Sequence, residues 1–596
     1  MKSQYFVPIC RELINNPKAT QRELASGGGI SLGIVNATIN QCKTEGLLES
    51  ADAQGLFLTK KGLAELEKYR VRNAIILAAG FGSRCVPMTY ETPKGLLSVY
   101  GEPMIERQIK QLHEKGITEI IIVVGYKKEH FDYLIDKYGV KLVFNPEYTT
   151  KNNLSSVYRV LPWLESSYLL MSDFWIENNI FNTYESRSWY SCQYFDVATA
   201  EWCVEVTASD KIASLAIGGS DAWAIVGPAY FSASFSAVFS EYVKEYYARP
   251  GTEDFYWEHI LRDKIESLPM YINRQSGNVH EFENLDELRI FDPSYDKNAQ
   301  SGIMRSISKV FDVSQSKIQN VKPIKKGMTN DSFLFSIGEK NYVYRVPGAG
   351  TDKLINRENE YSVYQIVSRL GLCEDIIYIN PKNGHKIAAF FDNCRVCDPQ
   401  DAKDVRMCMK KLREFHTSKL RVEHTFDIFG QIEFYEKLFG GSSCYRDYAD
   451  TKAGIMELRE YIDAQEKDWV LSHIDAVPDN FLFIGDGSGD FSEIRMIDWE
   501  YAGMQDPHVD IAMFAVYAMY DRKHVEALID SYFDGGSCPP ETRLKIYAYI
   551  ASCGFLWSNW CEFKRTKGVE YGEYAMLQYR FAKDYYKVFN ENKNRK

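Results

Sequence analysis

The apolar pattern of the chain changes at Asn73, and this change constrains the fold more than any other feature. From that residue an apolar strand, a turn and a helix alternate, in the order NAIILAAG, PMIERQIKQLHEKG and TEIIIVVGY. This alternation is typical of βαβ units, which build a mostly parallel sheet. The pattern continues to about Pro293, so residues 71–297 are expected to form one α/β domain.

Two further blocks flank this domain. A single hydrophobic core rarely grows beyond about 250–300 residues, so a chain of 596 residues needs several. The polar stretch DPSYDKNAQSG (292–302) is the expected linker. Beyond it, SFLFSI and NYVYRV predict paired strands, and long helical segments follow to the C-terminus. We therefore expect a multidomain protein of α/β and α+β class, with domains at 1–70, 71–297 and 298–596.

Composition excludes several classes of protein. Hydrophobic residues make up 45% and charged residues 25%, both typical of globular chains, and a net charge of −11 argues against a protein that coats polyanions. Among the thirteen cysteines, Cys394 and Cys397 are the only close pair, and a zinc ribbon would need two such pairs. No signal peptide or membrane-length apolar run is visible. We expect a reduced, cytoplasmic protein.

The N-terminal block carries the strings ATQRELA and SLGIVNATINQCKTEGLLE, in which Thr20 and Ser31 can each cap a helix. These strings, followed by ESADAQGLFLTKKG as a hairpin, resemble the winged helix-turn-helix domains of MarR-like proteins. The resemblance implies that the 31–47 helix could enter the DNA major groove. Lysine and arginine barely exceed aspartate and glutamate here, which favours a docking or regulatory module. Both interpretations stay open.

The loop LAAGFGSR (77–84) has the glycine spacing of a phosphate-binding turn, with Gly80 and Gly82. Arg84, then Pro93-Lys94, then a Gly-x-Pro at 101–103 follow it. The whole ensemble resembles the nucleotidyltransferases that make sugar nucleotides and CDP-alcohols. The resemblance implies a Rossmann-like domain with a mixed sheet, a nucleotide against Ala79, Gly80 and Gly82, and Arg84 and Lys94 on the triphosphate. Fixed cations there would stabilise the negative charge of the leaving pyrophosphate.

Two carboxylates are candidates for Mg²⁺ in this domain. Asp173 follows the apolar strand in YLLMSDFWI, and carboxylate oxygens suit this hard cation. The string VHEFENLDEL (279–288) resembles the second acidic element of the family and puts Glu283 forward, with Glu281 as the alternative.

The segment NPEYTTKNNLSS (145–156) resembles the base-reading segment of phosphocholine cytidylyltransferases. The resemblance assigns Asn152, Asn153 and Ser155 to the CTP base. Aromatic and acidic residues then recur in EWCVEV and TEDFYWEHI, at the positions where the subfamily receives a quaternary ammonium. Such a group donates no hydrogen bond, so aromatic faces and a carboxylate must hold it. The candidates are Trp202, Asp254, Tyr256 and Trp257; burial of the two tryptophans in the core is the alternative.

The third block contains SHIDAVPDNFLF and, after it, IDWEYAG. The order of Asp475, Asn480 and Asp498 resembles that of aminoglycoside phosphotransferases and choline kinases, which have a protein-kinase-like fold. The resemblance implies that Asp475 orients the substrate hydroxyl and accepts its proton, while Asn480 and Asp498 hold Mg²⁺ on ATP. His473 is expected to brace this loop, and Asp510 to anchor it from the following helix.

The same resemblance places the ATP and alcohol sites. KKGMTNDSFLF (325–335), with Gly327, looks like the loop over ATP, and Arg345 stands where protein kinases have lysine. Its partner is open between Glu358 and Glu360, and Glu358 is put forward as a nucleotide contact. Trp557 and Trp560 lie three residues apart on one expected helix face and resemble the aromatic pair around choline. Glu500 and Tyr501 complete the expected substrate site; two core tryptophans are the alternative.

The two enzyme-like blocks share an intermediate. One would turn choline and ATP into phosphocholine, and the other would turn phosphocholine and CTP into CDP-choline and pyrophosphate. The chain thus resembles bacterial fusions of choline kinase and phosphocholine cytidylyltransferase that depend on Mg²⁺. Ethanolamine or another amino alcohol is the alternative substrate, and a transcription regulator with ligand-sensing domains is the alternative class. Part of the 14% aromatic content would then bind one cation at two sites.

Overall fold

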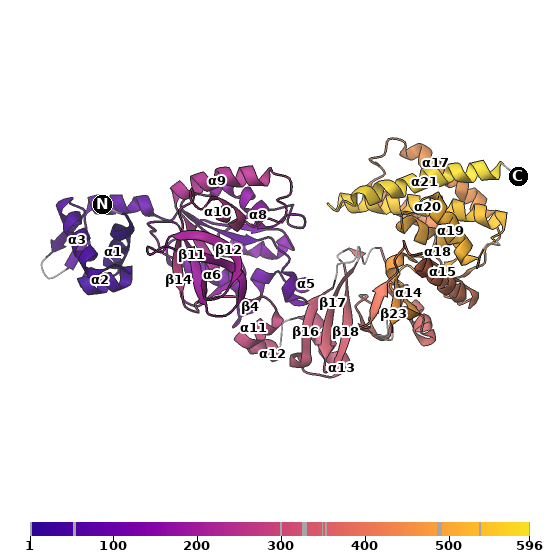
Figure 1. The fold of residues 1–596 in the computed structure, drawn as a ribbon, viewed down its shortest axis with the longest axis horizontal. Helices are drawn as coiled ribbons and strands as arrows, with labels where there is room; N and C mark the ends of the chain where they lie inside the picture. Colours follow the sequence, from indigo (N-terminus) through magenta and orange to yellow (C-terminus); the bar gives the residue numbers. More distant parts are fainter. Residues whose placement is uncertain are drawn as a thin grey trace. The chain divides into compact units, whose positions relative to one another are not determined.

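The computed structural model describes residues 3–51, 55–297, 301–324, 330–348, 350–351, 354–485, 491–535 and 538–594. The chain divides into two compact units, Met1–Val321 and Lys322–Lys596, and strand β16 (Ile318–Pro323) contains the division. Figure 1 labels the elements of both units. Within the described ranges, no helix is both long and apolar enough to cross a membrane.

Residues 3–66 form three helices, an antiparallel hairpin and a fourth helix: α1 (Ser3–Asn15), α2 (Gln21–Gly28), α3 (Leu32–Thr44), β1 (Leu48–Ala51), β2 (Gly55–Leu58) and α4 (Lys60–Leu66). The two predicted caps are confirmed. The Thr20 hydroxyl accepts from the Glu23 N–H in a reciprocal capping box, and the Ser31 hydroxyl accepts from the Ile34 N–H. Assignment of this segment to the winged-helix domains remains a prediction.

The N-terminal segment packs against the 181–188 region of the same unit. Tyr184 is buried in the apolar cluster formed by Phe6, Leu24, Val35 and their neighbours. Arg11 pairs with Glu185 at 3.3 Å, and the Arg70 guanidinium donates to the Tyr184 hydroxyl at 2.8 Å. The segment is therefore docked on the α/β domain through both apolar and charged contacts.

A nine-stranded mixed sheet forms the centre of the first unit, with the main path β12-β11-β13-β8-β3-β6-β7. Strands β6 and β8 flank β3 and run parallel to it, whereas β13 runs antiparallel to β8. The strands are β3 (Asn73–Ala78), β6 (Ile120–Val124), β7 (Lys141–Phe144), β8 (Ser167–Met171), β10 (Trp189–Phe195), β11 (Thr199–Val206), β12 (Ile212–Gly219), β13 (Ala222–Phe231) and β14 (Tyr271–Gln275).

Helices cover both faces of this sheet, which explains why every residue of β3 is buried. Ile75 and Leu77 belong to the cluster that includes α9 (Ala233–Tyr247), and Ala74 and Ile76 belong to the cluster that includes α6 (Met104–Glu114). The predicted mixed-sheet domain is thus observed, and the apolar strands β8, β3 and β6 lie inside its strand order.

The expected linker is only partly a linker. It contains α12 (Ser294–Lys297) and leads into α13 (Gly302–Phe311), whose Gly302 N–H donates to Glu91 at 2.9 Å. Arg289 also donates to the Ile318 and Gln315 carbonyls. These contacts keep residues 302–318 with the first unit, so the division of the chain lies beyond the boundary expected at residue 297.

The second unit begins with the antiparallel strands β17 (Asn330–Ile337), β18 (Lys340–Pro347), β20 (Lys386–Ala389) and β19 (Ile376–Ile379), with helix α14 (Arg357–Val367) between β18 and β19. Short strands follow at β21 (Cys394–Val396), β22 (Val470–Ser472), β23 (Phe481–Gly485), β24 (Phe491–Met496) and β25 (Gly503–Gln505). The predicted pair of strands followed by long helices is observed.

One apolar core joins the helices of this unit. Gly554 lets α20 and α21 approach, because a Cβ there would lie 2.7 Å from the Cβ of Phe581. The helices are α15 (Ala402–Thr417), α16 (Ile428–Phe439), α17 (Tyr448–Asp463), α18 (His508–Tyr517), α19 (Arg522–Tyr532), α20 (Pro540–Thr566) and α21 (Gly572–Lys593).

Candidate active sites

The loop after β3 forms one wall of the first candidate site. The carbonyl of Ala79 accepts from the Tyr126 N–H at 3.0 Å, which ties the loop to the end of β6. Gly82 has a φ of +68°, and a Cβ there would come 3.0 Å from the Cβ of Lys94. At Gly80 a Cβ would meet nothing within 4 Å. Glycine at position 82 therefore permits both the left-handed backbone and the close approach of Lys94, whereas Gly80 leaves open space for a ligand.

Lys94 lies in a short 3₁₀ turn (Lys94–Leu96) and is only 9% exposed. Its Nζ contacts the Asp173 carboxylate at 2.6 Å, just beyond the end of β8. Burial alone would lower the pKa of Lys94, but the negative charge of Asp173 outweighs it and the pKa is raised. The structure thus brings together the predicted triphosphate lysine and the predicted metal aspartate, and keeps the lysine protonated.

Glu281, the alternative, lies near the Lys94–Asp173 pair. Strand β15 (Val279–Glu281) pairs with β9 (Phe174–Ile176), which sets Glu281 opposite Phe174. The Glu281 carboxylate lies 3.8 Å from Lys94 Nζ, and burial together with the charge of Asp173 raises its pKa to about 7. Glu283 is two residues further on and forms an ion pair with Arg84. The structure thus puts Glu281 forward beside the lysine, and the choice of Glu281 or Glu283 as a metal ligand stays a prediction.

The three predicted base readers tie elements of the protein together. Asn152 caps α8 (Asn153–Arg159) by accepting from the Asn153 N–H at 2.8 Å, and Asn153 accepts from the Trp257 N–H at 2.9 Å. Ser155 is 1% exposed; its hydroxyl accepts a hydrogen bond from the Asn145 amide and donates one to the Asn152 carbonyl. Ser155 is therefore not available to a base, because its hydrogen bonds are satisfied inside the protein.

The predicted acceptor residues separate into surface and core. Trp202 on β11 is half-buried and packs edge-on against His259 at 5.0 Å, while Tyr256 is 44% exposed and lies parallel to His259 at 6.1 Å. Trp257 is 2% exposed and stacks on Tyr190, so it is a core residue and the prediction of a substrate contact is not supported. Asp254 is exposed and contributes only its carbonyl, to Asn152.

Sequence reasoning missed two carboxylates in this region. Glu258 at the start of α10 (Glu258–Lys264) accepts from the Tyr190 hydroxyl at 2.8 Å, and its other oxygen is buried without a hydrogen-bond partner among the described residues. Burial raises the pKa of Glu258 to about 7, and it also raises the pKa of Glu201. A glutamate following two aromatic residues gives no local signal of burial, because tertiary packing alone decides it.

In the second unit, a buried ion network surrounds Arg345 on β18. Its guanidinium contacts Glu360 at 2.5 Å and Asp498 at 3.1 Å. The open choice is therefore resolved: Glu360, which is 1% exposed, is the partner, whereas Glu358 is exposed in the first turn of α14. Helix geometry explains this, because residues two apart lie on different faces. Gly327 lies outside the described residues.

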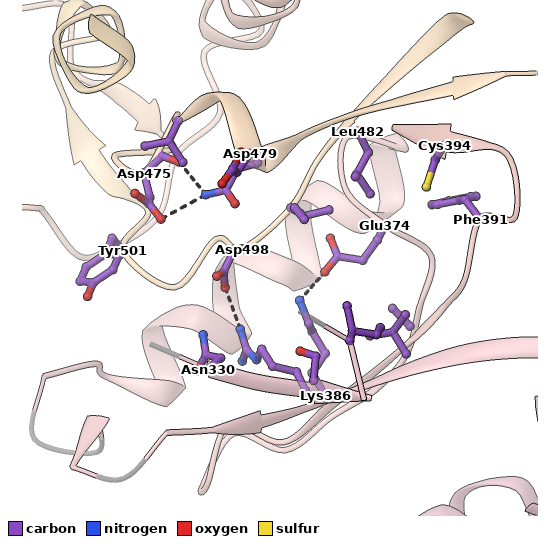
Figure 2. A pocket seen from close by; sticks show the side chains of 18 of the residues that line it. Asn330, Glu374, Lys386, Phe391, Cys394, Asp475, Asp479, Leu482, Asp498 and Tyr501 are labelled. Carbon is purple, nitrogen blue, oxygen red and sulfur yellow. Dashed lines mark hydrogen bonds and ion pairs between the residues drawn. The ribbon is translucent and has the colours of Figure 1, made fainter. Parts of the chain in front are cut away.

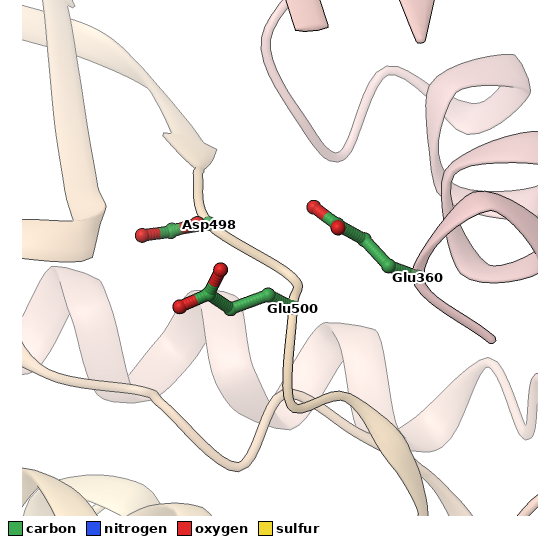
Figure 3. Close-up of side chains that lie close together, drawn as sticks. All are labelled: Glu360, Asp498 and Glu500. Atoms are coloured by element: carbon green, nitrogen blue, oxygen red, sulfur yellow. The ribbon is translucent and has the colours of Figure 1, made fainter. Parts of the chain in front are cut away.

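Figure 3 shows Glu360 arriving from helix α14 and Asp498 and Glu500 from one loop, with carboxylate oxygens of all three within 4.8 Å of one another. Arg357 and Arg345 together offset two of the three negative charges, and Arg357 contacts Glu360 at 2.8 Å and Glu500 at 3.2 Å. Glu500 also accepts from Asn330 at 3.0 Å. The prediction that Glu500 contacts the alcohol is corrected, because its side chain is held in this network and does not line the cavity.

The loop that carries Asp475 is held by Asp510, as expected from the sequence. The Asp510 carboxylate accepts from the backbone N–H groups of His473 and Ile474 at 2.9 and 2.7 Å and from His416 Nε2 at 2.8 Å. Ile474 has a φ of +68°, an unfavourable conformation for a β-branched residue. Three donors on one buried carboxylate thus stabilise a strained turn, and His473 contributes a bond to the Ile497 carbonyl at 2.9 Å.

Asp475, Asn480 and Asp498 face one cavity of about 400 Å³. The Asn480 amide donates to the Asp475 carboxylate at 3.1 Å, which leaves its oxygen for a cation. Burial, and then the charges of Asp498 and Glu500, raise the pKa of Asp475 well above its usual range. In Figure 2, Asp475 and Asp498 face the same space, with Tyr501 on one side and Phe391 on the other.

Aromatic rings close one end of this cavity. Trp557 packs edge-on against Tyr501 at 5.9 Å and against Trp560 at 5.8 Å, and all three line the cavity. Sequence reasoning missed most of the other lining residues, among them the polar side chains of Glu374, Lys386, Asp479, Tyr517 and Tyr574. Lys386 stands opposite Arg345 in the β18–β20 ladder and forms an ion pair with Glu374. The position of Lys386 opposite Arg345 follows from the register of β18 and β20, which the sequence alone does not give.

Comparison with known proteins places both units. Choline-phosphate cytidylyltransferase of Streptococcus pneumoniae is 38% identical over 217 residues, which cover 36% of this chain and 95% of that protein. The chain belongs to this cytidylyltransferase family. The 2-aminoethylphosphonate cytidylyltransferase of Lancefieldella rimae is 39% identical over 228 residues, covering 37% of this chain and 93% of that protein. Residues 74–173 also match the MobA-like NTP transferase domain.

The second unit has its own relatives. Residues 321–534 match the choline/ethanolamine kinase family, and protein LicA of Haemophilus influenzae is 26% identical over 262 residues, covering 42% of this chain and 95% of that protein. The predicted fusion of a kinase of this type with a cytidylyltransferase is therefore confirmed. The protein is an enzyme with two transferase domains, a kinase of the choline/ethanolamine kinase type and a cytidylyltransferase.

Proposed function

We propose that the protein phosphorylates choline with ATP and then transfers CMP from CTP to the phosphocholine formed, giving CDP-choline and pyrophosphate. The observation that supports this order is that one chain carries both a kinase unit and a cytidylyltransferase unit. A phosphonate has a carbon–phosphorus bond, which no alcohol kinase forms. A kinase in the same chain therefore favours a phosphate ester as the acceptor of CMP over the 2-aminoethylphosphonate named for one relative.

In the cytidylyltransferase unit, an oxygen of phosphocholine attacks the α-phosphorus of CTP and the bond to pyrophosphate breaks. Lys94 and Arg84 are proposed to hold the triphosphate and to stabilise the charge that grows on the leaving group. Asp173 and Glu281 fit a divalent cation, because two carboxylates share only one buried lysine and the group therefore carries net negative charge. These residues would hold Mg²⁺, which would supply positive charge against the phosphate oxygens.

The metal assignment can be tested by exchanging one carboxylate at a time. Glu281→Gln is expected to raise the Mg²⁺ concentration for half-maximal CDP-choline synthesis about tenfold or more, because one of two anionic ligands is lost. Glu283→Gln should leave that concentration unchanged within about twofold and instead alter the KM for CTP through Arg84. The reverse pattern in Mg²⁺ titrations of the two variants would restore Glu283 as the ligand.

In the kinase unit, the choline hydroxyl attacks the γ-phosphorus of ATP and the bond to ADP breaks. Asp475 is proposed to orient the hydroxyl and to take its proton, and Asn480 and Asp498, which line the same cavity, are proposed to hold Mg²⁺. Arg345 contacts Asp498 at 3.1 Å and is buried against Glu360, so it is proposed to reach the nucleotide phosphates from a fixed position. Trp557, Tyr501 and Trp560 are proposed to receive the ammonium.

Asp510→Asn should weaken the kinase through its loop alone. An amide cannot accept from His473, Ile474 and His416 together, and its own N–H group would oppose one of these donors. We expect choline kinase kcat to fall about 10–100-fold and the free energy of unfolding of this unit to fall by about 3–5 kcal/mol. Steady-state assays with added phosphocholine should show unchanged CDP-choline synthesis. Retained kinase kcat would contradict the anchoring role.

The substrate is tested by incubating the full chain with ATP, CTP and Mg²⁺ and one amino alcohol at a time. CDP-choline and pyrophosphate should form from choline at a kcat/KM at least about tenfold above that for ethanolamine, because a primary ammonium prefers carboxylates to aromatic faces. A preference for ethanolamine, or turnover of 2-aminoethylphosphonate with CTP alone, would overturn the proposal. Because both proposed reactions consume nucleoside triphosphates, we also propose that the protein acts in the cytoplasm.

We also propose that residues 1–70 form a winged-helix docking module. Tyr184 is buried in the apolar cluster of this segment, and Arg11 and Arg70 contact Glu185 and Tyr184. Such a docked, weakly charged domain is a poor polyanion binder. An electrophoretic mobility shift assay with DNA from upstream of the coding region tests this. Sequence-specific binding would contradict the docking role and support the transcription-regulator alternative.

A further inference from the structure

The cavity of the kinase unit contains a carboxylate that the reaction described above does not use. Asp479 lies in the short 3₁₀ turn Pro478–Asn480, directly before Asn480, and lines the cavity. Its Oδ2 accepts from the Tyr517 hydroxyl at 2.9 Å, and Tyr517 lines the same cavity from the end of α18. Asp479 is exposed, and no ion pair with it is found among the residues that the structure describes, so no cationic side chain neutralises it there.

The surroundings of this carboxylate are aromatic. Tyr517 packs edge-on against Tyr574 at 6.1 Å, and both rings are half-buried on the cavity wall. Burial and the negative charges of Asp479 and Asp475 raise the pKa of Tyr517, so its hydroxyl stays a donor to Asp479. The charge of Asp475 acts on Tyr574 as well. This aromatic wall is therefore near the group that would accept the hydroxyl proton.

The other carboxylates of the cavity have different partners. Asp475 is bonded to Asn480, Asp498 contacts Arg345, and Glu374 is paired with Lys386. A quaternary ammonium needs aromatic faces and an anion within a few ångströms, because it donates no hydrogen bond. Asp479 offers that anion beside Tyr517, with no cation competing for it among the described residues.

We propose that Asp479, held in place by Tyr517, is the anionic partner of the trimethylammonium group in the kinase cavity and sets the preference for a cationic alcohol. This assignment rests on the proposed choline kinase activity and adds a specificity-determining residue to it. The purely structural alternative is that the Tyr517–Asp479 bond only fastens α18 to the catalytic loop. The two are distinguished by a substrate that keeps the shape of choline and loses its charge.

The test compares choline with 3,3-dimethylbutan-1-ol, in which carbon replaces the nitrogen. In Asp479→Asn, kcat/KM for choline should fall about 5–20-fold, mainly through KM, and the loss should shrink at high ionic strength. The same constant for the neutral alcohol, measured as substrate or as competitive inhibitor of choline, should change less than about twofold. Tyr517→Phe should cost about 2–5-fold for choline only, and the double variant should be no worse than Asp479→Asn.

The matched control is Asp447→Asn. Asp447 also accepts from a tyrosine hydroxyl, that of Tyr579 at 2.8 Å, but lies outside the cavity lining, so its replacement should leave both alcohols unaffected. Equal losses for choline and the neutral alcohol in Asp479→Asn would assign Asp479 a structural role and overturn the proposal. Unchanged choline kinetics would do the same. Failure of the wild-type chain to phosphorylate choline would instead overturn the proposed function itself.

Discussion

Asp475→Asn is expected to abolish choline phosphorylation while added phosphocholine is still converted to CDP-choline. The substitution keeps the size of the side chain and removes the carboxylate that would accept the hydroxyl proton. Orientation and proton acceptance together contribute about 10³-fold or more to such a reaction. ADP release from choline and ATP should therefore fall by at least that factor, and pyrophosphate release from phosphocholine and CTP should stay within about twofold of wild type.

Asp534→Asn is the control for this experiment. Asp534 belongs to the same unit but is exposed, with only a loose contact to Arg413 at 3.7 Å. It should leave both half-reactions unchanged. If Asp475→Asn eliminated both activities in a folded protein, the model of two separate sites would be wrong. If choline were still phosphorylated at more than about one tenth of the normal rate, Asp475 would not be the proton acceptor.

The sequence predicted correctly which residues come together where a short motif fixes their spacing. The order of Asp475, Asn480 and Asp498 led to one cavity, and the apolar strand before Asp173 placed that carboxylate beside Lys94. These positions follow from strands and tight turns, whose geometry is local. Apolar periodicity predicted the parallel centre of the sheet and the helical second unit, because it reports which faces are buried, whereas the mixed sheet was implied by the family resemblance.

The remaining site residues depended on long-range packing. Glu281 was preferred to Glu283 only by the pairing of β15 with β9, and a register shift of two residues cannot be read from an acidic string. Trp257 and Tyr256 are neighbours directly before α10 begins at Glu258, yet Trp257 is in the core and Tyr256 is exposed. Asp479 and Tyr517 meet across 38 positions of the chain, which no local motif could indicate.

Lys94→Met is expected to stop the second reaction and leave the first intact, so that phosphocholine accumulates from choline, ATP and CTP. Methionine keeps most of the apolar stem but removes the ammonium that contacts Asp173 at 2.6 Å and Glu281 at 3.8 Å. Loss of a fixed cation at a leaving pyrophosphate should cost about 10²–10³-fold in kcat for CDP-choline synthesis. Choline-dependent ADP release should be unchanged.

The matched control is Lys110→Met, which removes an exposed lysine of the same unit that pairs only with Glu102 at 2.6 Å. Its CDP-choline synthesis should remain within about twofold of wild type, because an exposed pair is worth little. Thermal unfolding separates catalysis from folding: Lys94→Met must keep a cooperative transition for the first unit. A folded Lys94→Met protein that still makes CDP-choline at more than about one tenth of the wild-type kcat would remove Lys94 from the triphosphate site, since about 1.4 kcal/mol of stabilisation at most could then be assigned to it.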